Sequence, residues 1–293
     1  MEATAVEFIA RQDWLEQVSE AVTPLIKKAF ESAGEAGQQA KNFLNGVWLG
    51  HPLHPVLTDL PLGAWTVALA LDTTEAATGH REWGYGADGA VTVGLVGAVG
   101  AAITGMTDWS DTYGRAKRVG LVHGLLNLSA AAMYLTSLMQ RRKGSREAAR
   151  GSALAGYSIA LTAAYLGGNL VYEEQIGVDH TAAMTFPADF VAVLPENELP
   201  EDTLKKVMAK GVPVLLVRHE GQVRAMVETC AHLGGPLSEG KLENGSVICP
   251  WHASRFDLRD GHIIHGPSTH PQPCFETRIR NGQIEVRGTK RTA

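Results

Sequence analysis

The chain lacks any strong imbalance of charge. Its 26 lysines and arginines stand against 31 aspartates and glutamates, which gives a formal net charge of −5 over 293 residues. Because nucleic-acid-binding surfaces carry clustered basic residues, we expect no nucleic-acid partner. The N-terminus also lacks a basic stretch followed by an apolar core, so we expect no cleaved signal peptide. The length suffices for two domains.

Cysteine is scarce, with only three in the chain. Cys230 and His232 form the sequence C-A-H, and Cys249 and His252 lie in C-P-W-H. Two thiolates and two imidazoles suit a [2Fe–2S] cluster in which two cysteines hold one iron and two histidines the other. The same four residue types can also bind zinc tetrahedrally. Cys274 lies in a strand-like run and is expected to be a buried free thiol, so no intramolecular disulfide is predicted.

The residues around these donors favour iron and sulfur over zinc. The first loop reads CAHLGGPL from residue 230, and the second reads CPWHASRFD from residue 249. Gly234 and Gly235 let the backbone approach a cluster closely, and Pro250 stiffens the second loop. The Ser254 hydroxyl and backbone N–H groups can donate hydrogen bonds to the cluster sulfurs.

Both loops resemble the two cluster-binding loops of Rieske proteins, each of which supplies one cysteine and one histidine. The resemblance implies four ligands to the two irons: Cys230, His232, Cys249 and His252. It implies second-sphere roles for Gly234 and Ser254. No catalytic residue is predicted.

Several features of high-potential Rieske proteins are missing from the loops. In that group each loop carries an extra cysteine, joined in a disulfide, and a tyrosine hydrogen-bonds a ligand sulfur. Here Gly235, Trp251 and Phe256 stand at those places. Fewer hydrogen bonds to sulfur leave the reduced cluster less stabilised and lower its potential. The loops therefore resemble the ferredoxin type that feeds oxygenases.

This resemblance implies a role as an electron-transfer component with redox partner proteins. Rieske ferredoxins receive electrons from a flavin reductase and pass them to an oxygenase or a cytochrome. The chain is not expected to be an oxygenase itself, because that activity needs a mononuclear iron on a further domain. Only forty-one residues follow His252. A redox or iron sensor is the alternative function.

The C-terminal part alternates in the manner of short strands, which predicts an all-β domain. The predicted strands are 190–194, 212–219, 222–228, 246–249, 256–258, 261–264, 274–280 and 283–287. Asn281 and Gly282 signal a tight hairpin turn between the last two. Residues 203–210 are predicted to form a short helix.

Long segments with almost no charge lie between residues 52 and 172. The four segments are 52–71, 89–107, 119–140 and 151–172. Segments of about 20 apolar residues match the bilayer core, so we predict four transmembrane helices. The first is interrupted by Pro55, Asp59 and Pro61. A buried soluble bundle is the alternative.

The predicted fold class is multi-domain, with an all-α four-helix transmembrane bundle followed by an all-β Rieske-type domain. Residues 8–43, which precede the bundle, show an amphipathic helical pattern. That segment either lies on the membrane surface or packs on the other domain. The expected domains are 1–44 for this segment, 45–175 for the bundle, 176–188 for a linker and 189–290 for the Rieske domain.

The membrane part resembles a bacterial four-helix membrane domain known as a domain of unknown function (number 2231), which occurs fused to Rieske domains. The resemblance rests on His-Pro-Leu-His-Pro from His51, Thr-Asp-Trp at 107–109, His123, and Gly-Gly-Asn-Leu-Val-Tyr at 167–172. It implies a multi-pass protein of a bacterial cell membrane, in contact with lipid.

Four spans would gather His51, His54 and His123 on the side that carries the C-terminal domain. Ionisable groups at membrane depth are costly and usually functional. Two histidines on different helices can ligate a haem iron, and one can hydrogen-bond a quinone, so both are candidate cofactors here. The alternative is that His51 and His54 cap helix ends.

The side of the membrane on which the Rieske domain lies follows from two opposing arguments. The basic loop 140–151 favours the cytoplasm for itself and hence the outside for the Rieske domain. A folded cluster domain, however, needs an export signal that Arg141-Arg142 match poorly, and a low-potential cluster suits cytoplasmic donors. We therefore expect the cytoplasmic side.

Overall fold

The computed structural model describes residues 5–288, which form two compact units. The first unit contains the residues up to Ala40 together with Pro52–Ile176. The second contains Lys41–His51 and the residues from Gly177 onward. The sequence places residues 1–44 in one segment, whereas in the structure Lys41–His51 belongs with the C-terminal unit.

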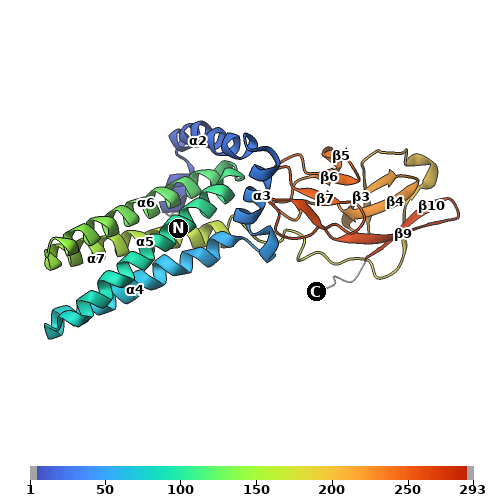
Figure 1. Ribbon diagram of the computed structural model, residues 1–293. Helices are drawn as coiled ribbons and strands as arrows, with labels where there is room; N and C mark the ends of the chain where they lie inside the picture. Colours follow the sequence, from blue (N-terminus) through green and yellow to red (C-terminus); the bar gives the residue numbers. More distant parts are fainter. Residues whose placement is uncertain (1–4, 289–293) are drawn as a thin grey trace. The chain divides into compact units, whose positions relative to one another are not determined.

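The first unit is entirely helical (Figure 1). Its helices are α1 (Ala5–Ala10), α2 (Asp13–Glu31), the first part of α3 (Gly34–Asn45), α4 (Leu53–Thr78), α5 (Arg81–Ser110), α6 (Gly114–Arg142) and α7 (Arg146–Tyr172). The four long helices pack as a bundle in which α4 and α6 each contact both α5 and α7. Consequently α4 and α6 lie at opposite corners of the bundle. The amphipathic segment 8–43 is not one helix but is divided among α1, α2 and α3.

Three of the long helices, α5, α6 and α7, are long and apolar enough to cross a membrane. Large apolar side chains on their outer faces remain exposed, as at Val96, Leu128 and Leu161. The fourth helix, α4, does not meet the same measure, because its 26 residues include several acids and internal Pro61. The sequence therefore gives the right helix count, but apolar length alone identifies three spans.

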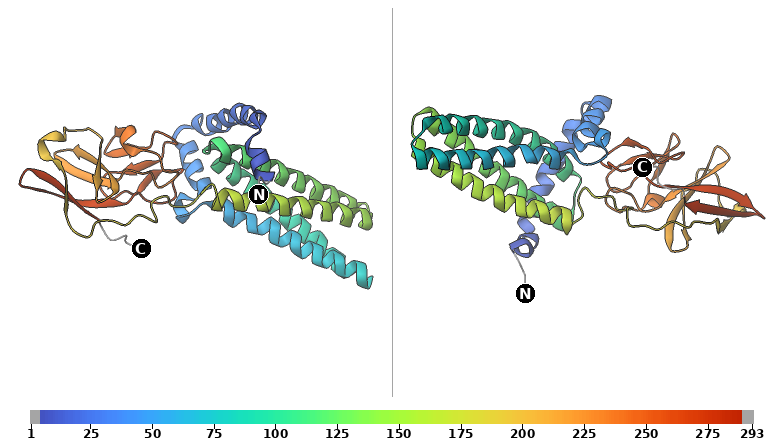
Figure 2. Two further views of the ribbon diagram at one scale, coloured as in Figure 1. Left: turned by 180° about the vertical axis from the view of Figure 1, so that it is seen from behind. Right: turned by 90° about the horizontal axis from the view of Figure 1, so that it is seen from below.

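The second unit is built on two antiparallel sheets (Figure 2). A six-stranded sheet has the order β1-β10-β9-β4-β3-β2, and a four-stranded sheet has the order β5-β6-β7-β8. The strands of the larger sheet are β1 (Val191–Pro195), β2 (Lys205–Ala209), β3 (Val212–His219), β4 (Gln222–Val227), β9 (Cys274–Arg280) and β10 (Gln283–Gly288). Those of the smaller sheet are β5 (Lys241–Glu243), β6 (Ser246–Ile248), β7 (Arg255–Asp257) and β8 (Ile263–His265). The predicted all-β domain is confirmed.

One predicted element is wrong. Residues 203–210 were expected to be helical, but Lys205–Ala209 form strand β2, which pairs with β3 from Lys205 opposite Leu216 to Ala209 opposite Val212. The stretch contains good helix formers, yet its side chains alternate between more and less exposed positions. Pairing with the buried strand β3 overrides the local helix propensity.

The second unit has two apolar clusters, and the second of them contains residues of both sheets. One cluster, around Val214, Phe275 and Ile284, lies on the larger sheet. The other includes Leu237, Val247 and Phe256, and it also contains Cys230 and Cys249. The two cysteines are therefore anchored in packed structure, which fixes the loops that begin with them.

Candidate metal centre

Two loops with matching backbone geometry present the predicted metal ligands. In the first, the Cys230 N–H donates to the Gly235 carbonyl at 2.8 Å, and the Gly234 N–H donates back to the Cys230 carbonyl at 2.9 Å. The second loop, between β6 and β7, repeats this pattern: Cys249 N–H to Ser254 at 2.9 Å, and Ala253 N–H to Cys249 at 3.1 Å. Each loop thus forms a tight turn that starts at a cysteine.

The turn requires a left-handed residue at the same place in each loop. Gly234 has φ of +77°, and Ala253 has φ of +60°. Glycine meets this requirement without steric cost, whereas alanine is strained there. A strained residue beside a ligand is typical of a functional loop that the surrounding structure holds in place.

The two cysteine thiols are neighbours, and each shifts the pKa of the other. The hydrogen bond from Cys230, helped by the N–H groups of Trp251 and His252, lowers the pKa of Cys249 to about 7. The same bond to Cys249 and burial raise the pKa of Cys230 well above its ordinary value. Its sulfur also receives the N–H groups of His232 and Leu233. Both loops therefore offer backbone donors that stabilise a bound thiolate.

The two histidines form a second pair. The rings of His232 and His252 have centres 5.1 Å apart at an interplanar angle of 88°. Burial, with His252, His180 and Lys41 nearby, lowers the pKa of His232 well below its ordinary value. The imidazole is therefore neutral, which is the form that binds metal.

The spacing of these donors distinguishes one metal ion from two. A tetrahedral zinc ion with bonds of about 2.0–2.3 Å brings all its donor atoms within roughly 4 Å of each other. Among residues 5–288, one group of three potential ligand side chains has all its donor atoms within 4.8 Å, and it contains none of these four residues. A sulfur pair and a nitrogen pair held farther apart fit two irons.

Gly235 provides the space that a bound cluster needs. A Cβ atom at this position would lie 2.9 Å from the Cys249 sulfur and 3.1 Å from the Trp251 ring. Such contacts are closer than side-chain atoms tolerate. Where the disulfide-bearing type has a cysteine, this chain has Gly235, which has no side chain. The three cysteines of the chain are all free.

Ser254 and Phe256 are fully buried beside the second loop. The Ser254 hydroxyl oxygen accepts the Ser268 N–H at 3.0 Å, which leaves its own hydrogen to be donated. Phe256 packs in the apolar cluster under the loops and has no hydroxyl to offer. Cys274 lies outside the loops, and burial raises the pKa of its thiol to about 12, so the thiol stays protonated.

A residue that no sequence pattern singles out supports the first loop. The Gln272 side chain is buried, and its carbonyl oxygen accepts the Ala231 N–H at 2.9 Å. Its amide donates to the Val227 and Thr229 carbonyls at 2.7 and 2.8 Å. Glutamine is usually exposed, and only its place between two prolines sets it apart in sequence.

A second unpredicted support comes from far along the chain. The Asn42 carboxamide accepts the Gly266 N–H at 3.0 Å and contacts the Ile264 carbonyl at 3.4 Å. His180, which the sequence places in a linker, donates its N–H to the Ala231 carbonyl at 3.1 Å. One segment that precedes the four long helices in the sequence and one that follows them thus contact loops of the second unit.

The structure brings together two of the three histidines predicted for the membrane part. His54 on α4 and His123 on α6 come together, with ring centres 6.2 Å apart. His51 is instead part of the second compact unit. The pair His54 and His123 is therefore a candidate site of the bundle.

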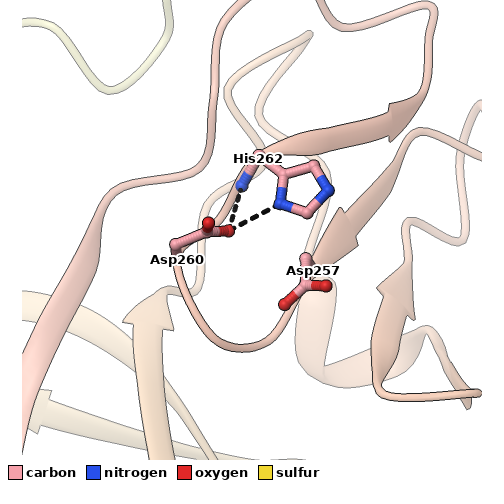
Figure 3. A group of neighbouring side chains, drawn as sticks. All are labelled: Asp257, Asp260 and His262. Carbon is pink, nitrogen blue, oxygen red and sulfur yellow. Dashed lines mark hydrogen bonds and ion pairs between the residues drawn. The ribbon is translucent and has the colours of Figure 1, made fainter.

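The group of three that does meet the 4.8 Å spacing consists of Asp257, Asp260 and His262 (Figure 3). Its polar atoms already have partners. Asp257 is bound by the Arg259 guanidinium at 2.9 and 2.7 Å, which lowers the pKa of this carboxyl to about 2. Asp260 accepts the His262 N–H at 3.0 Å and contacts its ring at 2.7 Å. These bonds describe a closed hairpin turn.

Two protein families match the chain. A Rieske [2Fe-2S] domain matches residues 189–276, and "Predicted membrane protein (DUF2231)" matches residues 50–180. The second match covers the long helices and the first covers most of the β-rich part, and residues 181–188 lie between them.

Individual relatives match less than half of the chain. The anthranilate 1,2-dioxygenase ferredoxin subunit of Burkholderia cepacia is 36% identical over 90 residues, which are 31% of this chain and 83% of that protein. Human apoptosis-inducing factor 3 is 29% identical over 118 residues, 40% of this chain. The chain spans only 20% of that protein and 16% of its mouse counterpart.

Among solved structures, a complex of reduced oxygenase and oxidized ferredoxin in carbazole 1,9a-dioxygenase contains a similar chain. It is 28% identical with a TM-score of 0.34, and the match covers 36% of this chain and 99% of that one. The Burkholderia cepacia ferredoxin subunit, 36% identical and matched over 83% of its length, is the relative that establishes kinship. The chain therefore belongs to the Rieske [2Fe-2S] family, and its Rieske domain follows a DUF2231 membrane-protein domain.

Proposed function

We propose that the protein is a membrane-anchored Rieske electron carrier of the low-potential ferredoxin type. The proposed ligands are Cys230, His232, Cys249 and His252. A cluster held in this way accepts and returns one electron. The observation that carries the proposal is the pair of matching loops, which offers two neighbouring sulfurs and, apart from them, two neighbouring imidazoles.

A low potential is supported by the surroundings of the second loop. Phe256 is fully buried and offers no hydroxyl to a ligand sulfur, and no disulfide joins the loops. Backbone N–H groups and Ser254 remain as donors. Because each hydrogen bond to sulfur stabilises the reduced cluster, this smaller set favours a lower potential.

The proposed partners are a flavin reductase that supplies electrons and an oxygenase or cytochrome that accepts them. The Burkholderia cepacia relative is a ferredoxin subunit of a dioxygenase, which supports this choice. Trp251, beside His252, is 46% exposed and provides an apolar contact for such a partner. Near-neutral overall charge gives no support to a nucleic-acid partner.

The helices α5, α6 and α7 are proposed to anchor the protein in a bacterial cell membrane, in contact with lipid. We further propose that the Rieske domain faces the cytoplasm. Arg141 and Arg146, two of the five basic residues that favour the opposite orientation, pair with Asp72, Asp88 and Glu75 within the bundle. They are therefore weak markers of a cytoplasmic loop.

Reduction by a physiological type of donor tests the carrier function. The purified full-length protein is mixed with NADH and a ferredoxin reductase, and the cluster is followed by EPR and by its visible absorption. We expect one electron per chain and sustained transfer to an added oxygenase or cytochrome. A cluster that reduces but never passes its electron on would contradict the proposal and favour a sensor.

A second redox group in the bundle completes the proposal, with haem or quinone as the candidate cofactor. His54 and His123 are the residues that support it. His51 supports it less, since it belongs to the other compact unit.

A further inference from the structure

The bundle is built from two copies of one helical hairpin. Helix α4 carries His54, Trp65 and Asp72, which are separated by eleven and then seven residues. Helix α6 carries His123, Tyr134 and Arg141 at the same two spacings. The partner helices carry glycines eleven residues apart, Gly94 and Gly105 on α5, and Gly156 and Gly167 on α7. The hairpins α4–α5 and α6–α7 therefore carry these residues in the same arrangement along the sequence.

Equivalent residues of the two copies meet across the bundle. Trp65 and Tyr134 stack with ring centres 4.0 Å apart, and both are buried. Asp72 and Arg141 form a buried ion pair. These two layers are closed by direct contact between the partners.

The histidine layer is different. The rings of His54 and His123 have centres 6.2 Å apart and are nearly perpendicular, at 87°. Both residues are only half-buried. This separation of perpendicular rings is an edge-to-face arrangement, and it is longer than the stacking contact of the layer below.

Each ring is held by the helix behind it. His54 Nδ1 lies 2.9 Å from the Ala101 carbonyl oxygen, and His123 Nδ1 lies 2.8 Å from that of Ala163. A carbonyl can only accept, so Nδ1 carries the hydrogen and Nε2 keeps its lone pair. Metal-binding histidines typically have this arrangement.

Glycines make room for the two rings. A Cβ at Gly105 would lie 2.6 Å from the His54 ring, and one at Gly167 would lie 3.1 Å from the His123 ring. The amide of Asn127, which also bonds the His123 carbonyl at 3.0 Å, lies 3.2 Å from His123 Nε2. When a metal binds Nε2, the Asn127 amide would leave that nitrogen and keep its hydrogen bond to the His123 carbonyl.

The unprotonated Nε2 atoms of the two histidines distinguish between a quinone, a bare metal ion and a haem. Quinone carbonyls are acceptors and need donors, whereas an unprotonated Nε2 accepts. A bare metal ion needs four or more ligands, and within residues 5–288 no third histidine, cysteine or acid joins this pair at ligand spacing. A haem supplies four nitrogens of its own and leaves two axial positions.

We propose that His54 and His123 are the two axial ligands of one haem iron. Two imidazoles bound on opposite sides of a metal at about 2.0 Å have ring centres roughly 6 Å apart, in agreement with the 6.2 Å observed. The inference rests on the proposed electron-carrier function: one electron from the reduced cluster converts ferric haem to ferrous, with no bond made or broken.

Haem titration of the full-length protein in detergent tests the site. Haemin should bind at about one per chain and give the low-spin optical and EPR spectra of bis-histidine iron. His54→Ala and His123→Ala should each weaken binding at least about tenfold or convert the iron to high spin. Added imidazole should restore the low-spin spectrum. His80→Ala, whose ring is exposed beside Glu82 at 3.1 Å, is the control and should bind haem normally.

The inference fails if the folded wild type binds no haem, binds quinone instead, or if both bundle variants bind haem as the wild type does. Circular dichroism and the cluster EPR signal of each variant show that it is folded. A normal, reducible cluster without haem binding would overturn this inference alone. Haem binding in a protein without a [2Fe–2S] cluster would overturn the proposed carrier function and leave the haem site standing.

Discussion

At the scale of single residues, the four proposed ligands differ in what they contribute. The cysteines lie in an apolar cluster and share backbone donors, whereas the histidines are half-buried at the edge of it. Neutral imidazoles leave a cluster with less negative charge than thiolates do. The potential therefore depends on the histidines.

We predict that His232→Cys lowers the potential of the cluster. A thiolate adds negative charge that opposes reduction, so the potential should fall by on the order of 100 mV, toward that of four-cysteine clusters at roughly −400 mV. Direct electrochemistry or a redox titration measures this. His262→Cys, on an exposed turn outside the loops, is the control. An intact His232→Cys cluster with unchanged potential would mean that His232 is not a ligand.

Gly235→Ala is predicted to impair cluster assembly. The added methyl would meet the Cys249 sulfur at 2.9 Å, and overpacking of this kind costs about 1–3 kcal/mol. Iron content and visible absorption per chain should both decrease. Gly151→Ala, where a methyl meets nothing within 4 Å, should assemble the cluster normally. Equal iron content in both variants would contradict this account of the loop.

At the scale of elements, the sequence predicted most strands correctly. Alternating residues and the Asn281-Gly282 turn located β9 and β10 well, because these signals are local. Strand β2 was missed, since its sequence favours a helix and only pairing with β3 makes it a strand. The support of the loops by Gln272 and Asn42 also escaped prediction, because both contacts are long-range in sequence. Gln272 bonds a residue 41 positions away, and Asn42 bonds one 224 positions away.

Gln272→Ala should destabilise the first cluster loop. It leaves the Ala231 N–H and the carbonyls of Val227 and Thr229 without this partner, and a buried group without a hydrogen bond costs about 1–3 kcal/mol. The cluster should be lost at a lower temperature, as followed by its visible absorption. Gln222→Ala, on an exposed position of β4, should leave that temperature unchanged. Identical cluster loss in the two variants would refute the role of Gln272.

At the scale of the whole molecule, each unit is stabilised by its own buried contacts. The bundle contains a buried network of Arg141 and Arg146 with three acids. The Rieske unit contains none of these residues. A change in the network should therefore affect the bundle and spare the cluster.

Arg141→Ala is predicted to destabilise the bundle by about 3–5 kcal/mol, because it leaves the buried carboxylate of Asp72 unpaired. The Arg141 side chain is 1% exposed, whereas the adjacent Arg142 is exposed and provides the matched control. Thermal unfolding in detergent, followed by far-ultraviolet circular dichroism, measures the difference. Equal unfolding temperatures for Arg141→Ala and Arg142→Ala would show that the network contributes little.

The central claim, that the two loops hold a [2Fe–2S] cluster on two cysteines and two histidines, is tested most directly by metal analysis and EPR of the purified full-length protein. We predict about two iron atoms per chain, a rhombic signal after reduction, and hyperfine coupling to the nitrogens of two histidines. Single substitutions at His232 and His252 should each remove one of the two couplings from any cluster that remains. A colourless, EPR-silent protein with one zinc ion per chain would contradict the account.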